Sequence, residues 1–126
     1  MLHTADVQIV TEQLKMFLNK HLPAGEKIDL LLSGENGDSR LLTYYTQCEG
    51  VFNKQITVAR FKHMMGEYPS SSATALWLAC YILKEQYLPV HMLKYPSSQK
   101  SFSRILIYNN YKGQQHSFIL VEKAGL

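Results

Sequence analysis

One apolar stretch near the middle of the chain constrains the fold more than any other feature. Its apolar side chains surround a predicted helix on nearly every side before Lys84: they are Ala73, Leu76, Trp77, Cys80, Ile82 and Leu83. A helix of this kind either spans a membrane or lies at the centre of a domain. The run of about ten residues is well short of the roughly 20 that a membrane span needs. We therefore expect residues 70–86 to form the buried central helix of a soluble domain.

Composition excludes several classes of protein. The chain has 126 residues, of which 46% are hydrophobic and 18% charged. These values favour one folded domain over residues 1–126 and are too apolar for a disordered segment. The net charge of +3 is small, and no Lys/Arg cluster is longer than two residues. We therefore expect neither nucleic acid nor a membrane as a partner.

The first residues and the two cysteines indicate the compartment. The N-terminus lacks the basic start and apolar core of a signal peptide. Cys48 and Cys80 both fall in predicted helices, where buried or half-buried free thiols are more common than a disulfide in a reducing environment. We expect a cytoplasmic protein.

Helical and strand patterns alternate along the chain. Helices are expected over residues 5–21, from Asp38 or Ser39 through Cys48, and over 70–86; strands are expected at 28–32, 55–59, 104–108 and 117–122. Gly113 lies between the last two strands, which indicates an antiparallel hairpin over about residues 104–122. The alternation predicts an α/β fold, layered α/β/α, with a mostly parallel mixed sheet.

Three sequence blocks resemble the motifs of a known family, in the family's order. Residues 28–38, IDLLLSGENGD, resemble a strand followed by N-A-H-G-T-x-T. Residues 62–67, KHMMGE, resemble K-x-M-x-G-H ahead of a buried helix, and residues 83–90, LKEQYLPV, resemble its end, L-x-x-G-x-I-P-P. Residues 108–121, YNNYKGQQHSFILV, resemble S-N-S-F-G-F-G-G-x-N-A-x-L-V. Over roughly residues 5–124 the chain resembles the C-terminal half of a beta-ketoacyl synthase, a thiolase-fold condensing enzyme.

This resemblance implies a thiolase-like half-domain and a function in fatty acid or polyketide biosynthesis. The chain would be part of a 3-oxoacyl-acyl-carrier-protein synthase, an acyltransferase whose cysteine nucleophile lies in the N-terminal half. The implied partners are acyl carrier protein and a ketosynthase N-terminal half or subunit, with a homo-oligomer possible and no cofactor. Two alternatives stay open: a non-catalytic ketosynthase-like binding subunit, and a fragment without activity.

The resemblance also names the candidate site residues. Lys62 matches the family lysine, whereas the two catalytic histidine positions fall on Gly34 and Glu67. Tyr111 stands where the family has a phenylalanine that gates the acyl pocket, and Asn109 is a candidate substrate-binding residue beside it.

Chemistry limits what Glu67 can do at a histidine position. A neutral histidine donates a hydrogen bond to a developing oxyanion, whereas an ionised carboxylate repels it. Glu67 could replace histidine only if burial kept it protonated. Otherwise it would accept backbone N–H groups at the start of the following helix. Lys62 could pair with Glu67 or lie in solvent.

The remaining histidines and the GENGD loop favour structural roles. His63 and His116 lie near the motifs but are expected to be ordinary polar residues. His3, His21 and His91 have no ligand spacing, so no metal site is expected. The loop over residues 34–38 follows a strand and precedes a helix, but it lacks a phosphate-binding pattern and indicates a tight turn with a helix cap.

The predicted strands leave one question about the sheet. The resemblance implies a further strand ahead of residue 5 that none of the four predicted strands supplies. We expect an empty place at the middle of the sheet unless residues 1–10 are extended, the strand order closes up, or a partner chain fills the place.

Overall fold

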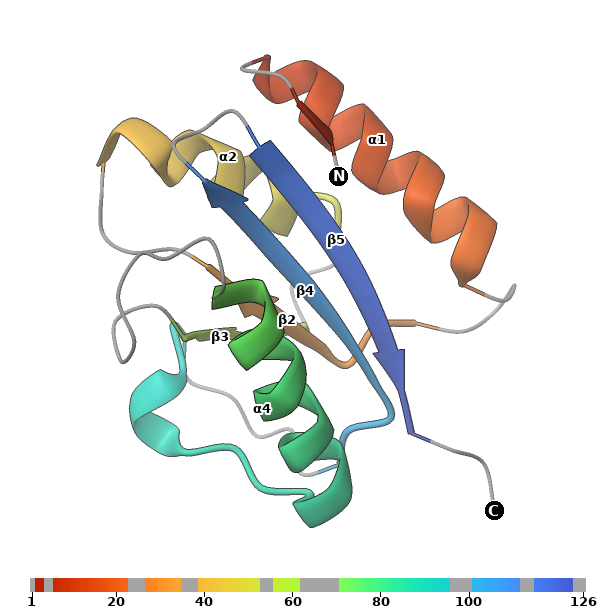
Figure 1. Cartoon of the computed structure of the whole chain (residues 1–126), viewed down its shortest axis with the longest axis vertical. Helices are drawn as coiled ribbons and strands as arrows, with labels where there is room; N and C mark the ends of the chain where they lie inside the picture. Colours follow the sequence, from red (N-terminus) through yellow and green to blue (C-terminus); the bar gives the residue numbers. More distant parts are fainter. Residues whose placement is uncertain are drawn as a thin grey trace.

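A five-stranded mixed sheet forms the middle of the molecule (Figure 1). The computed structural model describes residues 2–3, 6–22, 27–34, 39–52, 56–61, 71–95, 101–111 and 115–123. The strands are β1 (Leu2–His3), β2 (Leu30–Ser33), β3 (Thr57–Arg60), β4 (Arg104–Tyr111) and β5 (Gln115–Glu122), in the order β1-β5-β4-β2-β3. β2 pairs in parallel with β3 and β4, whereas β5 runs antiparallel to β4 and β1 antiparallel to β5.

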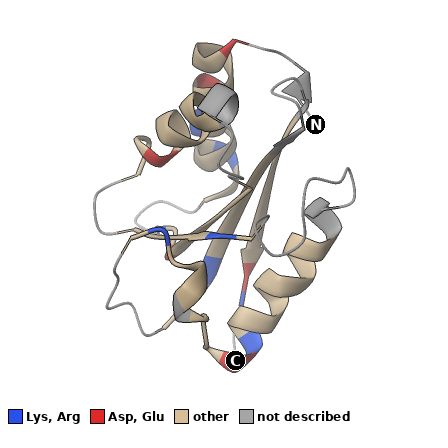
Figure 2. Ribbon diagram, turned by 90° about the vertical axis from the view of Figure 1, so that its left-hand side faces the viewer, with Lys and Arg blue, Asp and Glu red and all other residues tan. Residues whose placement is uncertain are grey.

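Helices cover both faces of this sheet (Figure 2). α1 (Val7–His21) and α2 (Ser39–Glu49) lie on one face, and α4 (Ser71–Glu85) lies on the other, followed by the short 3-10 helix η1 (Val90–Met92). The helices that follow β2 and β3 therefore lie on opposite faces, and after β3 the chain reverses its direction and passes β2 to form β4 on its other side.

Two apolar clusters fill the spaces between the layers. On the α4 face, Ala75, Ala79 and Ile82 pack against Leu30, Leu32 and alternate residues of the neighbouring strands. On the other face, Val10 and Leu14 of α1 and Tyr45 and Cys48 of α2 pack against a second set that includes Leu31 and Leu106. Each residue of β2 is buried, as expected for a parallel strand covered on both faces.

Polar side chains fix the ends of two helices. Asp6 caps α1 by accepting hydrogen bonds from the N–H groups of Gln8 (2.9 Å) and Ile9 (3.4 Å). Gln86 ends α4 in a left-handed conformation, with φ of 55°. Its side-chain Nε2 donates to the carbonyls of Leu83 (2.7 Å) and Phe102 (2.8 Å), and its Oε1 accepts from the N–H of Phe102 (2.7 Å). This glutamine ties the end of α4 to the segment that leads into β4.

The two edges of the sheet differ. β3 is covered, because Leu93 forms an antiparallel bridge with Ala59 and the N–H of Lys94 donates to the carbonyl of Val58 at 2.9 Å. Glu49 at the end of α2 holds the same segment through Lys94 Nζ at 2.7 Å and Tyr95 Oη at 2.9 Å. β1 covers only the first two residues of β5, at His116 and Gln115.

The mixed α/β fold, the predicted helices and the C-terminal hairpin are confirmed, with one correction. The hairpin strands are longer than predicted, so Asn109 lies within β4 rather than in the turn. Of the alternatives given for the empty place in the sheet, the described residues show that the strand order closes up, because β2 pairs directly with β4; Leu2–His3 are extended, but at the edge.

The prediction of a helix buried on all sides is also wrong for this chain. α4 buries only its sheet-facing side, and its outer side chains are exposed: Leu76 by 39%, Trp77 by 66% and Tyr81 by 40%. Cys80 is exposed as well, which contradicts the prediction that both thiols are buried or half-buried. Trp77 and Tyr81 stack on each other, with ring centroids 5.8 Å apart.

Candidate functional site

The carboxyl ends of the three parallel strands form the best-supported candidate site. The strand order β4-β2-β3, with α2 and α4 on opposite faces, makes the boundary between β2 and β4 a topological switch point. In open α/β sheets, ligands bind outside the carboxyl ends of the strands at such a point. Gly34 follows β2 there, and its N–H donates to the carbonyl of Tyr108 at 2.9 Å. Asn109, the next residue of β4, lies beside Gly34 and is 6% exposed.

Gly34 is closely surrounded by two polar side chains. A Cβ atom at this position would collide with Oδ1 of Asn109 and lie 3.2 Å from Oη of Tyr45. Those two groups come from β4 and α2, so two elements converge on the glycine that follows β2. The close approach explains why residue 34 has no side chain.

The structure describes two of the four predicted site residues, Asn109 and the backbone of Tyr111. Asn109 lies at the switch point, as given above, in a buried position. Tyr111 is the last residue of β4, where its backbone pairs with Gln115, and a role for its side chain stays a prediction. Lys62 and Glu67 lie outside the described residues, which resume at Ser71 after Phe61. The structure therefore brings Asn109, Gly34 and Tyr45 together and leaves the proposed roles of Lys62 and Glu67 untested.

A buried histidine and tyrosine lie on the α1 and α2 face of the hairpin. His116 is 0% exposed, and its Nδ1 is 2.9 Å from Oη of Tyr108. Its ring also packs on Tyr44 of α2, with centroids 5.0 Å apart, while Tyr108 packs on Tyr45 at 5.1 Å. This network links the hairpin to α2 beside the switch point.

The sequence analysis missed this enclosure of His116, which it assigned to an ordinary polar role near the hairpin turn. The hairpin register contains the signal: Asn110 pairs with His116 and Tyr108 with Phe118, so residues 108 and 116 are diagonal neighbours on one face. Because the predicted strands stopped at Tyr108 and resumed at Ser117, His116 fell in the turn. The contact between Tyr45 and Gly34 was not predicted either.

Burial determines the reactivity of the Cys48 thiol on α2. Burial raises the pKa of Cys48 from 9.0 to about 12, and the neighbouring Glu49 carboxylate also raises it. A thiol with this pKa is protonated at neutral pH and is a poor nucleophile. Cys48 is therefore a packing residue of the α2 face.

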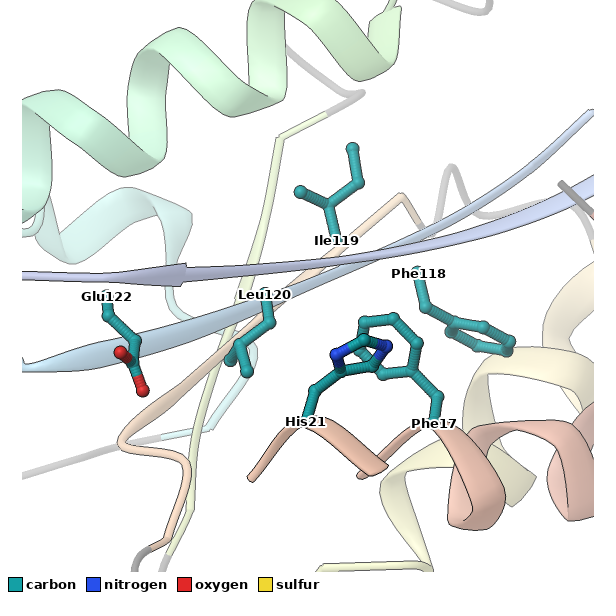
Figure 3. A pocket seen from close by; sticks show the side chains of 6 residues that line it. All are labelled: Phe17, His21, Phe118, Ile119, Leu120 and Glu122. Carbon is teal, nitrogen blue, oxygen red and sulfur yellow. The ribbon is translucent and has the colours of Figure 1, made fainter. Parts of the chain in front are cut away.

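A hollow of about 470 Å³ lies between the end of α1 and β5 (Figure 3). Phe17 and His21 line it from α1, and Phe118, Ile119, Leu120 and Glu122 line it from β5. The ring of Phe17 lies 4.7 Å from that of His21 and 6.0 Å from that of Phe118. This hollow lies beside the open edge of β5, away from the carboxyl ends of the parallel strands.

The described part of the chain contains neither a metal-ligand cluster nor a membrane-spanning helix. No three His, Cys, Asp or Glu side chains gather there closely enough to hold a metal ion. No described helix combines the length and apolar character of a membrane span. Comparison with known families, curated proteins and solved structures found no match to this chain.

Proposed function

We propose that the chain is part of, or a relative of, a 3-oxoacyl-acyl-carrier-protein synthase, which condenses acyl units in fatty acid or polyketide synthesis. The observation that carries this proposal is the backbone of Gln86. This residue stands at the glycine of the family motif L-x-x-G-x-I-P-P, and its φ of 55° is the conformation that glycine adopts without steric cost. A left-handed residue at the place of the motif's glycine supports the proposal.

The outer face of α4 supports the involvement of a second domain. Leu76, Trp77 and Tyr81 expose apolar surface on the helix that the family buries. A contiguous exposed apolar patch often marks an interaction site. A ketosynthase N-terminal half that carries the cysteine nucleophile is the partner that the resemblance implies, and it would cover this face.

Within such a complex, the residues of this chain would act at the carboxyl ends of the parallel strands. The amide oxygen of Asn109 lies next to Gly34, where the family has a histidine, so only the NH2 group of this side chain would be a donor. A protonated Glu67 would be the second donor to the thioester oxyanion, and Lys62 would orient it. Tyr111 would bound the acyl pocket.

The first experiment measures native mass and condensation together. The chain is expressed alone and with the polypeptide encoded immediately upstream, and each sample is weighed in solution and assayed with acyl- and malonyl-carrier protein. We expect a one-to-one complex, condensation only in that complex, and its loss in Glu67→Ala, which removes a donor that glutamine would still supply. Turnover by the 126-residue chain alone would refute the requirement for a separate N-terminal half.

A non-catalytic ketosynthase-like subunit is the second candidate, and Gly34 favours it. The space that a histidine would need at this position is filled by Asn109 and Tyr45. A subunit that binds a partner synthase or an acyl chain without catalysis needs neither histidine. A stable complex without condensation would favour this candidate, and activity unchanged by Glu67→Ala would exclude the role of Glu67.

A further inference from the structure

Within the part of the chain that the structure describes, the outer edge of β5 is unpaired over most of its length. β1 pairs with His116 and Gln115 only, and no described strand pairs with the outer side of Phe118–Glu122. This segment contains Phe118, Ile119, Leu120 and Val121 and has no proline, lysine or arginine. Natural proteins usually protect an edge strand with charges, prolines, bulges or a covering segment. The opposite edge, β3, is covered in this way by Leu93 and Lys94. The outer side of Phe118–Glu122 has no such covering segment among the described residues.

Hydrogen bonds elsewhere in the sheet show which groups of β5 point outward. The N–H of Lys123 donates to the carbonyl of Ser103, toward β4, at 2.8 Å. Backbone groups alternate along a strand, so Ile119 and Val121 also face β4. The N–H and C=O groups of Phe118, Leu120 and Glu122 consequently face away from β4, where a further strand would lie.

The short β1 strand gives the direction and register of that further strand. Leu2 faces His116 and His3 faces Gln115. If β1 were extended toward its N-terminal side, each added residue would face the next residue of β5 toward Glu122. Such a segment runs antiparallel to β5.

Side chains on both faces specify the chemistry of the incoming strand. Figure 3 shows Phe118 and Leu120 pointing toward α1 and Ile119 pointing toward α4. A residue opposite Leu120 would place its side chain at the hollow lined by Phe17 and His21. Ile119 and Val121 pack at the margin of the α4 cluster, so an incoming residue opposite them would extend that cluster. The strand must therefore be apolar on both faces, like β2.

We propose that the edge of β5 over Phe118–Glu122 accepts an extended apolar strand, antiparallel to β5 and continuing the line of β1, from the ketosynthase N-terminal half. The source of the strand rests on the proposed function, whereas the acceptor edge rests on the pairing of β1 and β5 alone. Main-chain hydrogen bonds to Phe118, Leu120 and Glu122 would supply the affinity, and the hollow would select an apolar side chain opposite Leu120.

The acceptor edge is tested with a strand attached to the chain itself. Five residues, Thr-Val-Ile-Val-Thr, are added ahead of Met1 so that their central isoleucine faces Leu120. The matched control is Thr-Val-Pro-Val-Thr, since proline has no N–H to donate to the Leu120 carbonyl. Amide hydrogen exchange is measured at Phe118, Leu120 and Glu122, with Ile119 and Val121 as internal references.

In the unextended chain we expect the amides of Ile119 and Val121 to be protected and those of Phe118, Leu120 and Glu122 to exchange rapidly. The isoleucine extension should slow the latter three by at least about tenfold relative to the proline extension. Equal exchange in the two extended chains would overturn the proposal. Concentration-dependent protection of the three amides in the unextended chain would overturn it too, because a second copy would then occupy the edge.

Exchange of the same amides in the complex distinguishes a failure of this proposal from a failure of the proposed function. In the complex with the upstream polypeptide, protection of Phe118, Leu120 and Glu122 supports the N-terminal half as the donor. A stable complex in which they still exchange rapidly overturns the donor while leaving the synthase proposal intact. If no complex forms, the proposed function and the donor both fail, and the two extended chains still decide whether the edge accepts a strand.

Discussion

At the scale of single residues, Gly34 determines the shape of the candidate site. Gly34→Ala should lower the free energy of unfolding by about 1–3 kcal/mol, because the new methyl group meets Asn109 and Tyr45 in a packed region. Urea denaturation measures the change. In an Asn109→Ala background the same substitution should cost less, and equal costs in the two backgrounds would show that Asn109 does not crowd this position.

Gln86 combines an unfavourable backbone conformation with favourable hydrogen bonds. Gln86→Ala and Gln86→Gly both remove three side-chain hydrogen bonds, each worth about 0.5–1.5 kcal/mol. Glycine relieves the cost of the φ of 55°, so it should be less destabilising than alanine by about 1 kcal/mol. Urea denaturation of the two variants measures this difference. Equal stabilities would contradict the left-handed conformation.

The buried thiol of Cys48 should make stability depend on pH at alkaline values. Its pKa is about 12 in the folded protein, compared with an ordinary value of 9.0, so only the unfolded chain ionises between these values. The contribution of Cys48 is complete below pH 9 and declines as the pH rises toward 12, by up to about 1.4 kcal/mol per unit. The stability difference between the wild type and Cys48→Ala should therefore shrink from pH 9 upward. A constant difference would contradict the raised pKa.

At the scale of elements, the sequence predicted the helices and strands well because their apolar periods are clear. The helices over residues 5–21 and 70–86 are found at 7–21 and 71–85. The ends of the hairpin were not predictable in the same way. Polar residues such as Asn109 and His116 resemble turn residues in sequence, but pairing across the hairpin extends both strands past them.

The environment of α4 could not be inferred from its sequence. The apolar residues on all sides of α4 indicate that both its inner and its outer face are suited to burial, but they do not indicate which molecule buries the outer face. Ala75 and Ala79 allow α4 to approach the sheet closely, whereas Trp77 lies on the opposite side. Prediction of the candidate site was limited in another way. The resemblance identified its glycine, whereas the contact of Tyr45 with this glycine depends on how α2 packs, which the sequence does not show.

Trp77 tests whether the outer face of α4 is an interface. Trp77→Ser should change the free energy of unfolding of the isolated chain by no more than about 0.5 kcal/mol, because the side chain is 66% exposed. In the proposed complex the same change should weaken binding by at least about tenfold, as expected for a buried aromatic anchor. Isothermal titration calorimetry measures the affinity, with Lys84→Ser, at an exposed polar position, as the control. Equal effects of the two variants would exclude Trp77 from the interface.

At the scale of the whole molecule, the sheet lies between two helical layers. α4 and the α1–α2 pair pack on opposite faces of the same strands, β2 and β4. Either layer that detached would expose apolar side chains of both strands. We therefore expect both layers to unfold in a single cooperative transition.

Two probes on opposite faces measure this cooperativity. Trp77, the single tryptophan, reports on the α4 layer by fluorescence, and the buried thiol of Cys48 reports on the α2 layer by chemical labelling in a Cys80→Ser background. Because β2 and β4 contribute to both clusters, the two denaturation curves should share one midpoint. An earlier transition of Trp77 alone would mean that α4 detaches from a sheet that remains folded. In that case the outer face of α4 would depend on its partner for stability as well as for binding, and the chain alone would be only partly folded.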